Sequence, residues 1–117
     1  MAEIPASAKP ALDILRGVGG DEMVAMLLKT FTQFADERVA KLGEEAGNFR
    51  WSEVASIAHA IKSSARQLGA MALADACAST EAAGRVDDSA KSLAGVTAIQ
   101  REYTAARAWM AEAGGMK

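Results

Sequence analysis

The 117 residues contain one histidine, and the residues that follow it could hold an anion. Lys62, Ser63 and Arg66 come three, four and seven residues after His59, spacings that bring side chains together on one face of a helix. An imidazole offers a nucleophilic nitrogen, two cations could neutralise incoming negative charge, and a small serine leaves the ring accessible. These residue types at these spacings indicate a site for a phosphoryl group.

The helix that carries His59 is expected to bury its opposite face. At ~100° per residue, an apolar stripe centred on Ile61 spans roughly 60° to either side, and His59 lies about 160° from that centre. The stripe consists of Val54, Ile57, Ala58, Ala65 and Leu68. His59 should therefore face solvent. Many surface histidines are only solvated side chains, so exposure by itself does not indicate function.

The segment that begins at His59 resembles the signature of histidine phosphotransfer (HPt) domains, which runs His-x-Leu/Ile-Lys-Gly-Ser/Ala-Ser/Ala-x-x-Leu-Gly. Residues 59–69 read His-Ala-Ile-Lys-Ser-Ser-Ala-Arg-Gln-Leu-Gly, so the one departure is Ser63 in place of the usual glycine. The resemblance implies that His59 accepts a phosphoryl group from the aspartate of one receiver domain and passes it to another. It also implies that Lys62, with Arg66, steadies the phosphoryl oxygens.

The resemblance gives Glu81 a role as well. In HPt domains the position twenty-two residues after the histidine often carries Gln or Glu, which hydrogen-bonds the imidazole from the neighbouring helix, and Glu81 stands there. Its carboxylate would accept the Nδ1 proton and fix the tautomer that leaves Nε2 unprotonated for attack. The alternative is an ordinary solvated glutamate.

The function expected from this resemblance is that of a phosphocarrier without kinase activity of its own. Its partners would be the receiver domains of a hybrid sensor kinase and of response regulators, docking on the face that holds Ser63 and Arg66. The chain itself would bind no metal or cofactor, since Mg²⁺ is expected on the receiver.

Two alternatives from other classes fit a helical chain. A phosphoacceptor fragment of a histidine kinase pathway is the first alternative, but as an enzyme in its own right it would need a glycine-rich ATP-lid motif or a nucleotide-binding α/β segment, and the sequence shows neither. The glycines of residues 17–20 are not a phosphate loop either, since the Lys-Ser/Thr and the preceding strand are absent. A non-catalytic helical adaptor is the second alternative. It would have no need of an outward imidazole beside Lys62.

Length, charge and residue composition exclude several other classes of protein. A length of 117 residues suits one domain, and a net charge of −2 argues against nucleic acid as a partner. No apolar run approaches the ~18 residues of a membrane span, and no signal peptide is evident, so we expect a cytoplasmic protein. The chain length favours a monomer. Cys77, the only cysteine, lies on an apolar stripe and is expected to be buried. One cysteine and one histidine cannot supply the about four ligands of structural zinc.

The pattern of caps and breaks predicts an all-α fold. We expect residues 1–9 to be a loosely ordered lead, and residues 1–117 to form a single domain. The first two expected helices are a short one from Pro10 to the glycines 17–20 and a long one that is capped by Asp21 and ends near 43–47. They are followed by the His59 helix to about Leu68, one that ends around Gly84, and one from the cap cluster 87–89 to Gly114. The last helix is expected to turn four side chains inward: Leu93, Val96, Tyr103 and Met110. Short connections then favour an antiparallel up-down four-helix bundle with a short additional N-terminal helix.

Ser63 offers a test of where a partner sits. If a receiver approaches this face closely, Ser63→Gln or Ser63→Arg should sharply reduce phosphotransfer by steric block, while Ser63→Gly should retain it at a helix-propensity cost of up to ~1 kcal/mol. Transfer from one phosphorylated receiver to the three variants measures this, with circular dichroism as the folding control. Equal rates in all variants would mean that the partner does not cover this part of the helix.

Overall fold

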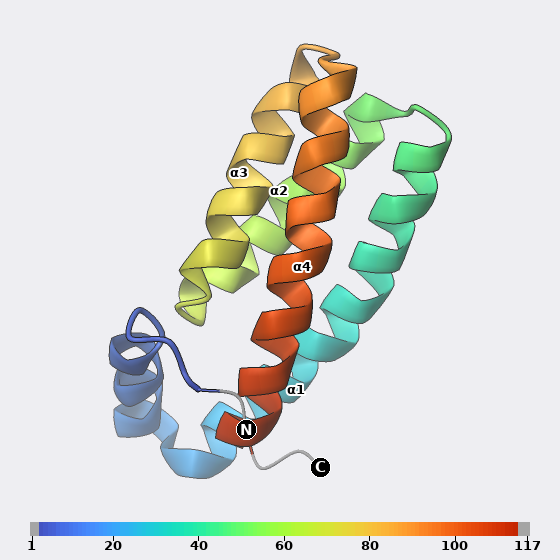
Figure 1. Ribbon diagram of the computed structural model, residues 1–117. Coiled ribbons are helices and arrows are strands. Elements are labelled where there is room, and N and C mark those ends of the chain that lie inside the picture. Colours follow the sequence, from blue (N-terminus) through green and yellow to red (C-terminus); the bar gives the residue numbers. More distant parts are fainter. Residues whose placement is uncertain (1–2, 115–117) are drawn as a thin grey trace.

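Four α-helices make up the computed structural model, which describes residues 3–114 (Figure 1). They are α1 (Lys9–Gly47), α2 (Trp51–Gln67), α3 (Met71–Arg85) and α4 (Ser89–Gly114). Successive helices run antiparallel, and each packs mainly on two neighbours: α1 and α3 both contact α2 and α4. The predicted all-α up-down bundle is confirmed.

The long helix α1 consists of two segments joined at Gly20. Its φ of 74° and ψ of −172° are conformations that only glycine adopts without strain. The first segment folds across the lower end of the bundle in Figure 1, as expected for the short N-terminal helix. The break is confined to that residue, since Gly17 and Gly19 stay helical. The predicted cap Asp21 instead accepts a hydrogen bond from Nε of Arg16 at 2.7 Å.

The three connections between helices have three residues each and close in the same way. The middle residue of each has positive φ: Phe49 at 58°, Gly69 at 76° and Asp87 at 53°. The N–H of the following residue bonds a carbonyl five positions back, as Ala70 does to Ala65 at 2.9 Å. These are Schellman endings, which satisfy the last carbonyls of a helix and reverse the chain within a few residues. Of these three residues, only Gly69 was predicted from the sequence to end a helix.

The segment that precedes α1 packs on the turn between α2 and α3. The sequence predicts a loosely ordered lead over residues 1–9, of which the first two lie outside the described part. Within the rest, Ala8 is fully buried, and Ser7 Oγ donates to the carbonyl of Gly69 at 3.1 Å. A Cβ on Gly69 would lie 2.6 Å from Cα of Ala8, so this contact requires glycine.

The predicted apolar stripes meet in one core. Its largest fully buried side chains are Leu12, Val24, Leu28, Leu42, Val54, Ile61, Leu73, Ile99 and Met110. Cys77 is buried as predicted, and this burial raises the pKa of its thiol to about 12. The prediction was wrong for Leu93, which is 47% exposed, because Ser92 and Gly95 take the inward positions of α4. Small residues there let α4 approach α3 closely.

A polar cluster joins α1 to α4. Arg107 donates to both oxygens of Asp36 at 2.9 Å, and the Tyr103 hydroxyl donates to the same carboxylate. The Arg107 guanidinium lowers the pKa of Asp36, whereas burial, followed by Asp36 itself, raises the pKa of Tyr103. This cluster holds α4 against α1, the helix that does not contact α3.

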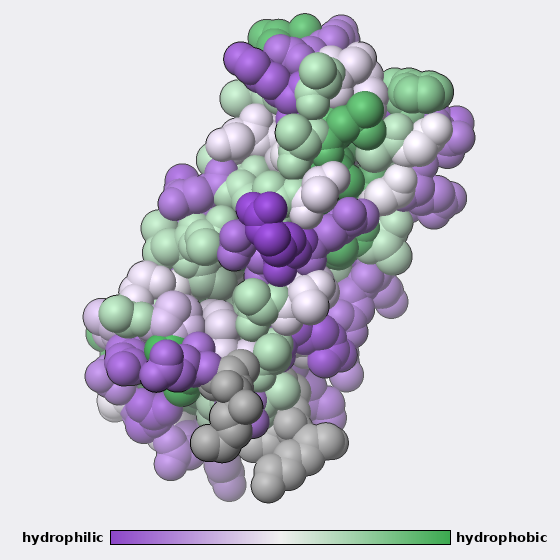
Figure 2. All heavy atoms as spheres, viewed as in Figure 1, coloured by the Kyte–Doolittle hydropathy of each residue, from purple (hydrophilic) through white to green (hydrophobic). Residues whose placement is uncertain are grey.

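One face of the molecule is mixed in character. On the face shown in Figure 2, hydrophilic side chains are scattered among small apolar ones, and no broad apolar face opens in the part drawn in colour. None of the helices within residues 3–114 combines the length and apolarity that a membrane crossing requires.

The close contact between α3 and α4 can be tested at Gly95. A Cβ there would lie 2.2 Å from Thr80 Oγ1 and 3.2 Å from Thr80 Cα, so Gly95→Ala should lower the unfolding free energy by about 1–3 kcal/mol. Urea denaturation measures this.

Gly17→Ala is the matched control, since no atom lies within 4 Å of its added Cβ, and it should raise stability by about 0.5–1 kcal/mol. If Gly95→Ala were as stable as Gly17→Ala, the helices would not be in the contact described.

Candidate functional site

His59 lies in the middle of α2 with 55% of its side chain exposed. On the other face of the helix, Val54, Ala58 and Ile61 are fully buried. The exposure predicted from the helical spacing is therefore what the structure has. The imidazole is accessible to a large partner.

Small residues bring α3 close to α2 beside this histidine. A Cβ on Gly84 would lie 2.6 Å from the carbonyl oxygen of Trp51 and 3.0 Å from Cβ of Ala55. Ala58 and Ala74 are fully buried as well, one on each helix. Because these residues keep the two helices near each other, a side chain of ordinary length on α3 can reach across to the imidazole.

That side chain is Glu81, whose carboxylate collects three donors. Oε2 lies 2.9 Å from Nδ1 of His59 and 2.8 Å from Nη2 of Arg85, and Oε1 lies 2.7 Å from Nζ of Lys62. The hydrogen bond from Lys62, then that from Arg85 and then that from His59 lower the pKa of Glu81 to about 2, against burial, which raises it. Glu81 is thus an ionised carboxylate in a buried position.

The charge state of Glu81 decides the tautomer of the neutral imidazole. An ionised carboxylate can only accept hydrogen bonds, so Nδ1 of His59 must be the protonated nitrogen and donate to Oε2. Nε2 then carries the lone pair. The arrangement leaves an exposed nucleophilic nitrogen with its ring orientation held from behind.

The other residues predicted for the site occupy two different settings. Ser63 and Arg66 are exposed on α2, and Ser63 Oγ lies 3.4 Å from the carbonyl oxygen of His59. Lys62, predicted as an outward cation, instead turns toward α3 and is partly buried against Glu81. The position of Glu81 across the helix seam explains the difference, since a buried carboxylate draws the nearest ammonium.

Arg85 also belongs to the cluster, although it was not predicted from the sequence. Its guanidinium donates from Nη2 and, at 3.3 Å, from Nε to the same oxygen of Glu81. The signal was present as an acidic and a basic residue four apart on one helix, a spacing that favours ion pairs. With Lys62, it brings two positive charges to one negative charge behind His59.

An apolar groove of about 340 Å³ runs beside the site between α1 and α2. It is lined by Leu15, Leu27, Thr30, Phe31, Phe34, Ser64, Gln67 and Leu68. Ser64 and Gln67 follow the exposed Ser63 and Arg66 directly in sequence, so the groove is partly lined by the same helix that carries His59.

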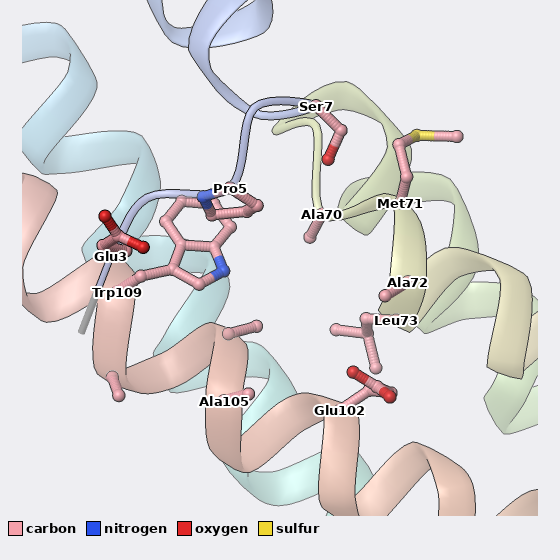
Figure 3. Close-up of a pocket in the computed structure, with 12 residues that line it drawn as sticks. Glu3, Pro5, Ser7, Ala70, Met71, Ala72, Leu73, Glu102, Ala105 and Trp109 are labelled. Carbon is pink, nitrogen blue, oxygen red and sulfur yellow. The ribbon is translucent and has the colours of Figure 1, made fainter.

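A second cavity is separate from this surface. It measures about 360 Å³ and lies where the N-terminal segment meets the start of α3 and the end of α4, with Pro5, Leu73 and Trp109 among its walls (Figure 3). No residue of the His59 cluster lines it. Within residues 3–114 we also find no group of three or more His, Cys, Asp or Glu side chains placed to hold a metal ion.

Comparison with known families and solved structures finds similar proteins. The family model described as Hpt domain matches residues 26–109, which include every member of the His59 cluster. The crystal structure of histidine-containing phosphotransfer protein B from Pseudomonas aeruginosa PAO1 aligns with a TM-score of 0.88, at 23% identity, over 98% of this chain and 99% of that chain. No match was found among curated proteins.

The Glu81 cluster should make stability depend on acid pH. The pKa of Glu81 is about 2 in the folded protein against an ordinary 4.5, so its contribution is complete above pH 4.5 and is lost as pH falls toward 2. At pH 7, Glu81→Gln should lower the unfolding free energy by about 1–3 kcal/mol. The difference between wild type and variant should shrink between pH 4.5 and 2.

Urea denaturation of both proteins across this pH range measures the effect. A difference that stays constant down to pH 2 would show that Glu81 is not held ionised by its neighbours.

Proposed function

Since this chain belongs to the Hpt domain family, we propose that it is a phosphocarrier in which His59 receives a phosphoryl group from one receiver domain and delivers it to another. The observation that carries the proposal is the hydrogen bond between Nδ1 of His59 and Glu81, with the rest of the ring open to solvent. It prepares one nitrogen as a nucleophile and leaves it accessible.

The transfer step uses the lone pair of Nε2. It attacks the phosphorus of an aspartyl phosphate in line, the P–N bond forms, and the P–O bond breaks with its electron pair leaving on the aspartate. Nδ1 keeps its proton throughout. The positive charge that develops on the ring of His59 is stabilised by the ionised Glu81, 2.9 Å from Nδ1. Delivery to a second aspartate is the reverse reaction.

The charge of the cluster suits a phosphoryl group. Lys62 and Arg85 together outweigh Glu81 by one positive charge, close to the atoms that a dianionic phosphoryl group would approach. Lys62 therefore stabilises the phosphoryl group by its charge while it holds Glu81 ionised. The receiver supplies Mg²⁺, and this chain supplies the oriented imidazole and the cations.

The partner surface extends from the histidine into the groove between α1 and α2. Ser63 and Arg66 are exposed on α2, and Phe31 and Phe34 are among the residues that line the groove. A receiver that covers this surface would exclude water from the reacting atoms. Apolar contact in the groove would supply affinity, and Arg66 would add charge at the rim.

The function is tested by replacing the phosphoacceptor. His59→Gln should abolish acceptance of ³²P from a phosphorylated receiver, because the amide has no comparable nucleophile. The fold should be unaffected, since the side chain contributes little packing. Label transfer and thermal unfolding followed by circular dichroism are the measurements. Transfer to the variant at the wild-type rate would refute the assignment.

A control separates carrier from kinase. The wild-type protein incubated with radiolabelled ATP and Mg²⁺ alone should stay unlabelled, and labelling would instead indicate a kinase activity. A non-catalytic adaptor would bind receivers and accept no label from them.

A further inference from the structure

The two cations bound to Glu81 differ in accessibility. Lys62 is 18% exposed, and its ammonium lies on Oε1 at 2.7 Å. Arg85 is the last residue of α3 and is 58% exposed. A partly buried lysine is expected to stay in place, whereas an exposed arginine side chain can change rotamer at little cost.

Arg85 also uses only part of its hydrogen-bonding capacity on Glu81. Both of its bonds go to one atom, Oε2 of Glu81, at 2.8 and 3.3 Å, and His59 approaches the same atom at 2.9 Å. A guanidinium has five N–H donors in a planar fork that fits two oxygens of a phosphoryl group. Glu81 therefore shares one oxygen between two donors, and Arg85 would gain by moving to a second anion nearby.

Space is available for such a movement. A hollow of about 360 Å³ between α2 and α3 is lined by Ser52, Ala55, Gly84, Arg85 and Asp87. Ala55 lies one helical turn before His59 on α2, so the hollow lies within about one turn of the imidazole and has Arg85 in its wall. The guanidinium thus has open space beside it as well as the Glu81 carboxylate.

We propose that Arg85 is a direct ligand of the phosphoryl group: when His59 is phosphorylated on Nε2, the guanidinium leaves Oε2 of Glu81 and binds the phosphoryl oxygens. Lys62 remains on Oε1 and keeps the carboxylate ionised, so Nδ1 of His59 keeps its acceptor. The inference rests on the proposed function, because it takes His59 as the phosphoacceptor. It assigns the two cations different roles, Lys62 as a positioning residue and Arg85 as the contact to the transferred group.

The first measurement is the rate at which phosphoramidate phosphorylates His59, which needs no receiver and no docking surface. Arg85→Gln should slow this loading about tenfold, because it removes a charged donor to the phosphoryl oxygens. Arg85→Lys should recover part of the rate. Arg101→Gln, an exposed arginine of α4 paired only with its neighbour Glu102 among the described residues, is the control and should load like wild type.

The second measurement separates contact from positioning. In ¹H–¹⁵N spectra, the Nε–H signal of Arg85, identified by its loss in Arg85→Lys, should shift when His59 is loaded. The ring ¹⁵N signals of unphosphorylated His59 should still show a protonated Nδ1 and an unprotonated Nε2 in Arg85→Gln, because Lys62 still holds Glu81. If the tautomer is lost in this variant, or if the loading rate is unaltered and the Arg85 signal stays in place, the proposal is overturned.

These outcomes are distinct from failure of the carrier function. Loading of wild-type protein with an unmoved Arg85 signal would overturn the arginine assignment and leave the phosphocarrier proposal intact. Loading with the expected shift, but without transfer to or from any phosphorylated receiver, would support the arginine contact and contradict the relay.

Discussion

The site depends on one buried carboxylate. Glu81 is kept ionised at the seam between α2 and α3, a place where an isolated charge would be strongly destabilised. It is tolerated because Lys62, Arg85 and His59 each donate to it within 3 Å. The same bonds that make the charge acceptable fix the imidazole tautomer and gather positive charge around the nucleophile. One physical requirement, the neutralisation of a buried anion, thus produces both features that phosphoryl transfer needs.

This arrangement requires the helices to be close, and much of the sequence provides for that. Gly84 brings the backbone of α2 within reach of α3, and Gly95 does the same between α3 and α4. The turn at Gly69 reverses the chain in three residues and also receives the N-terminal segment. The spacing of the helices therefore sets the length of the bond from His59 to Glu81. A substitution far from the histidine that widened this spacing would weaken the orientation of the ring.

The helical periodicity of the sequence predicted the exposure of His59 and the approximate positions of the helices, which depend on local sequence. The helical stripe placed His59 toward solvent, and the breaks marked the helices to within a few residues. Glu81 was reached through the resemblance alone, because nothing in its own helix shows that it faces a histidine. Arg85 and the inward turn of Lys62 depend on where α3 lies against α2, which periodicity does not contain. The positive φ of Phe49 and Asp87 was missed because these residue types adopt many other conformations, and tertiary packing selects this one.

The division of labour with a partner explains how so small a site can suffice. An imidazole in the correct tautomer already has its nucleophilic nitrogen exposed, so His59 needs no separate base to remove a proton before attack. In the proposed function the receiver binds the metal ion, and it docks on the groove beside α2. What the bundle must supply is a ring that does not rotate and a nearby charge that can respond when the phosphoryl group arrives. A rigid pair of helices meets the first demand, and an exposed arginine at the end of α3 meets the second, because rigidity and mobility are placed on different side chains of the same cluster.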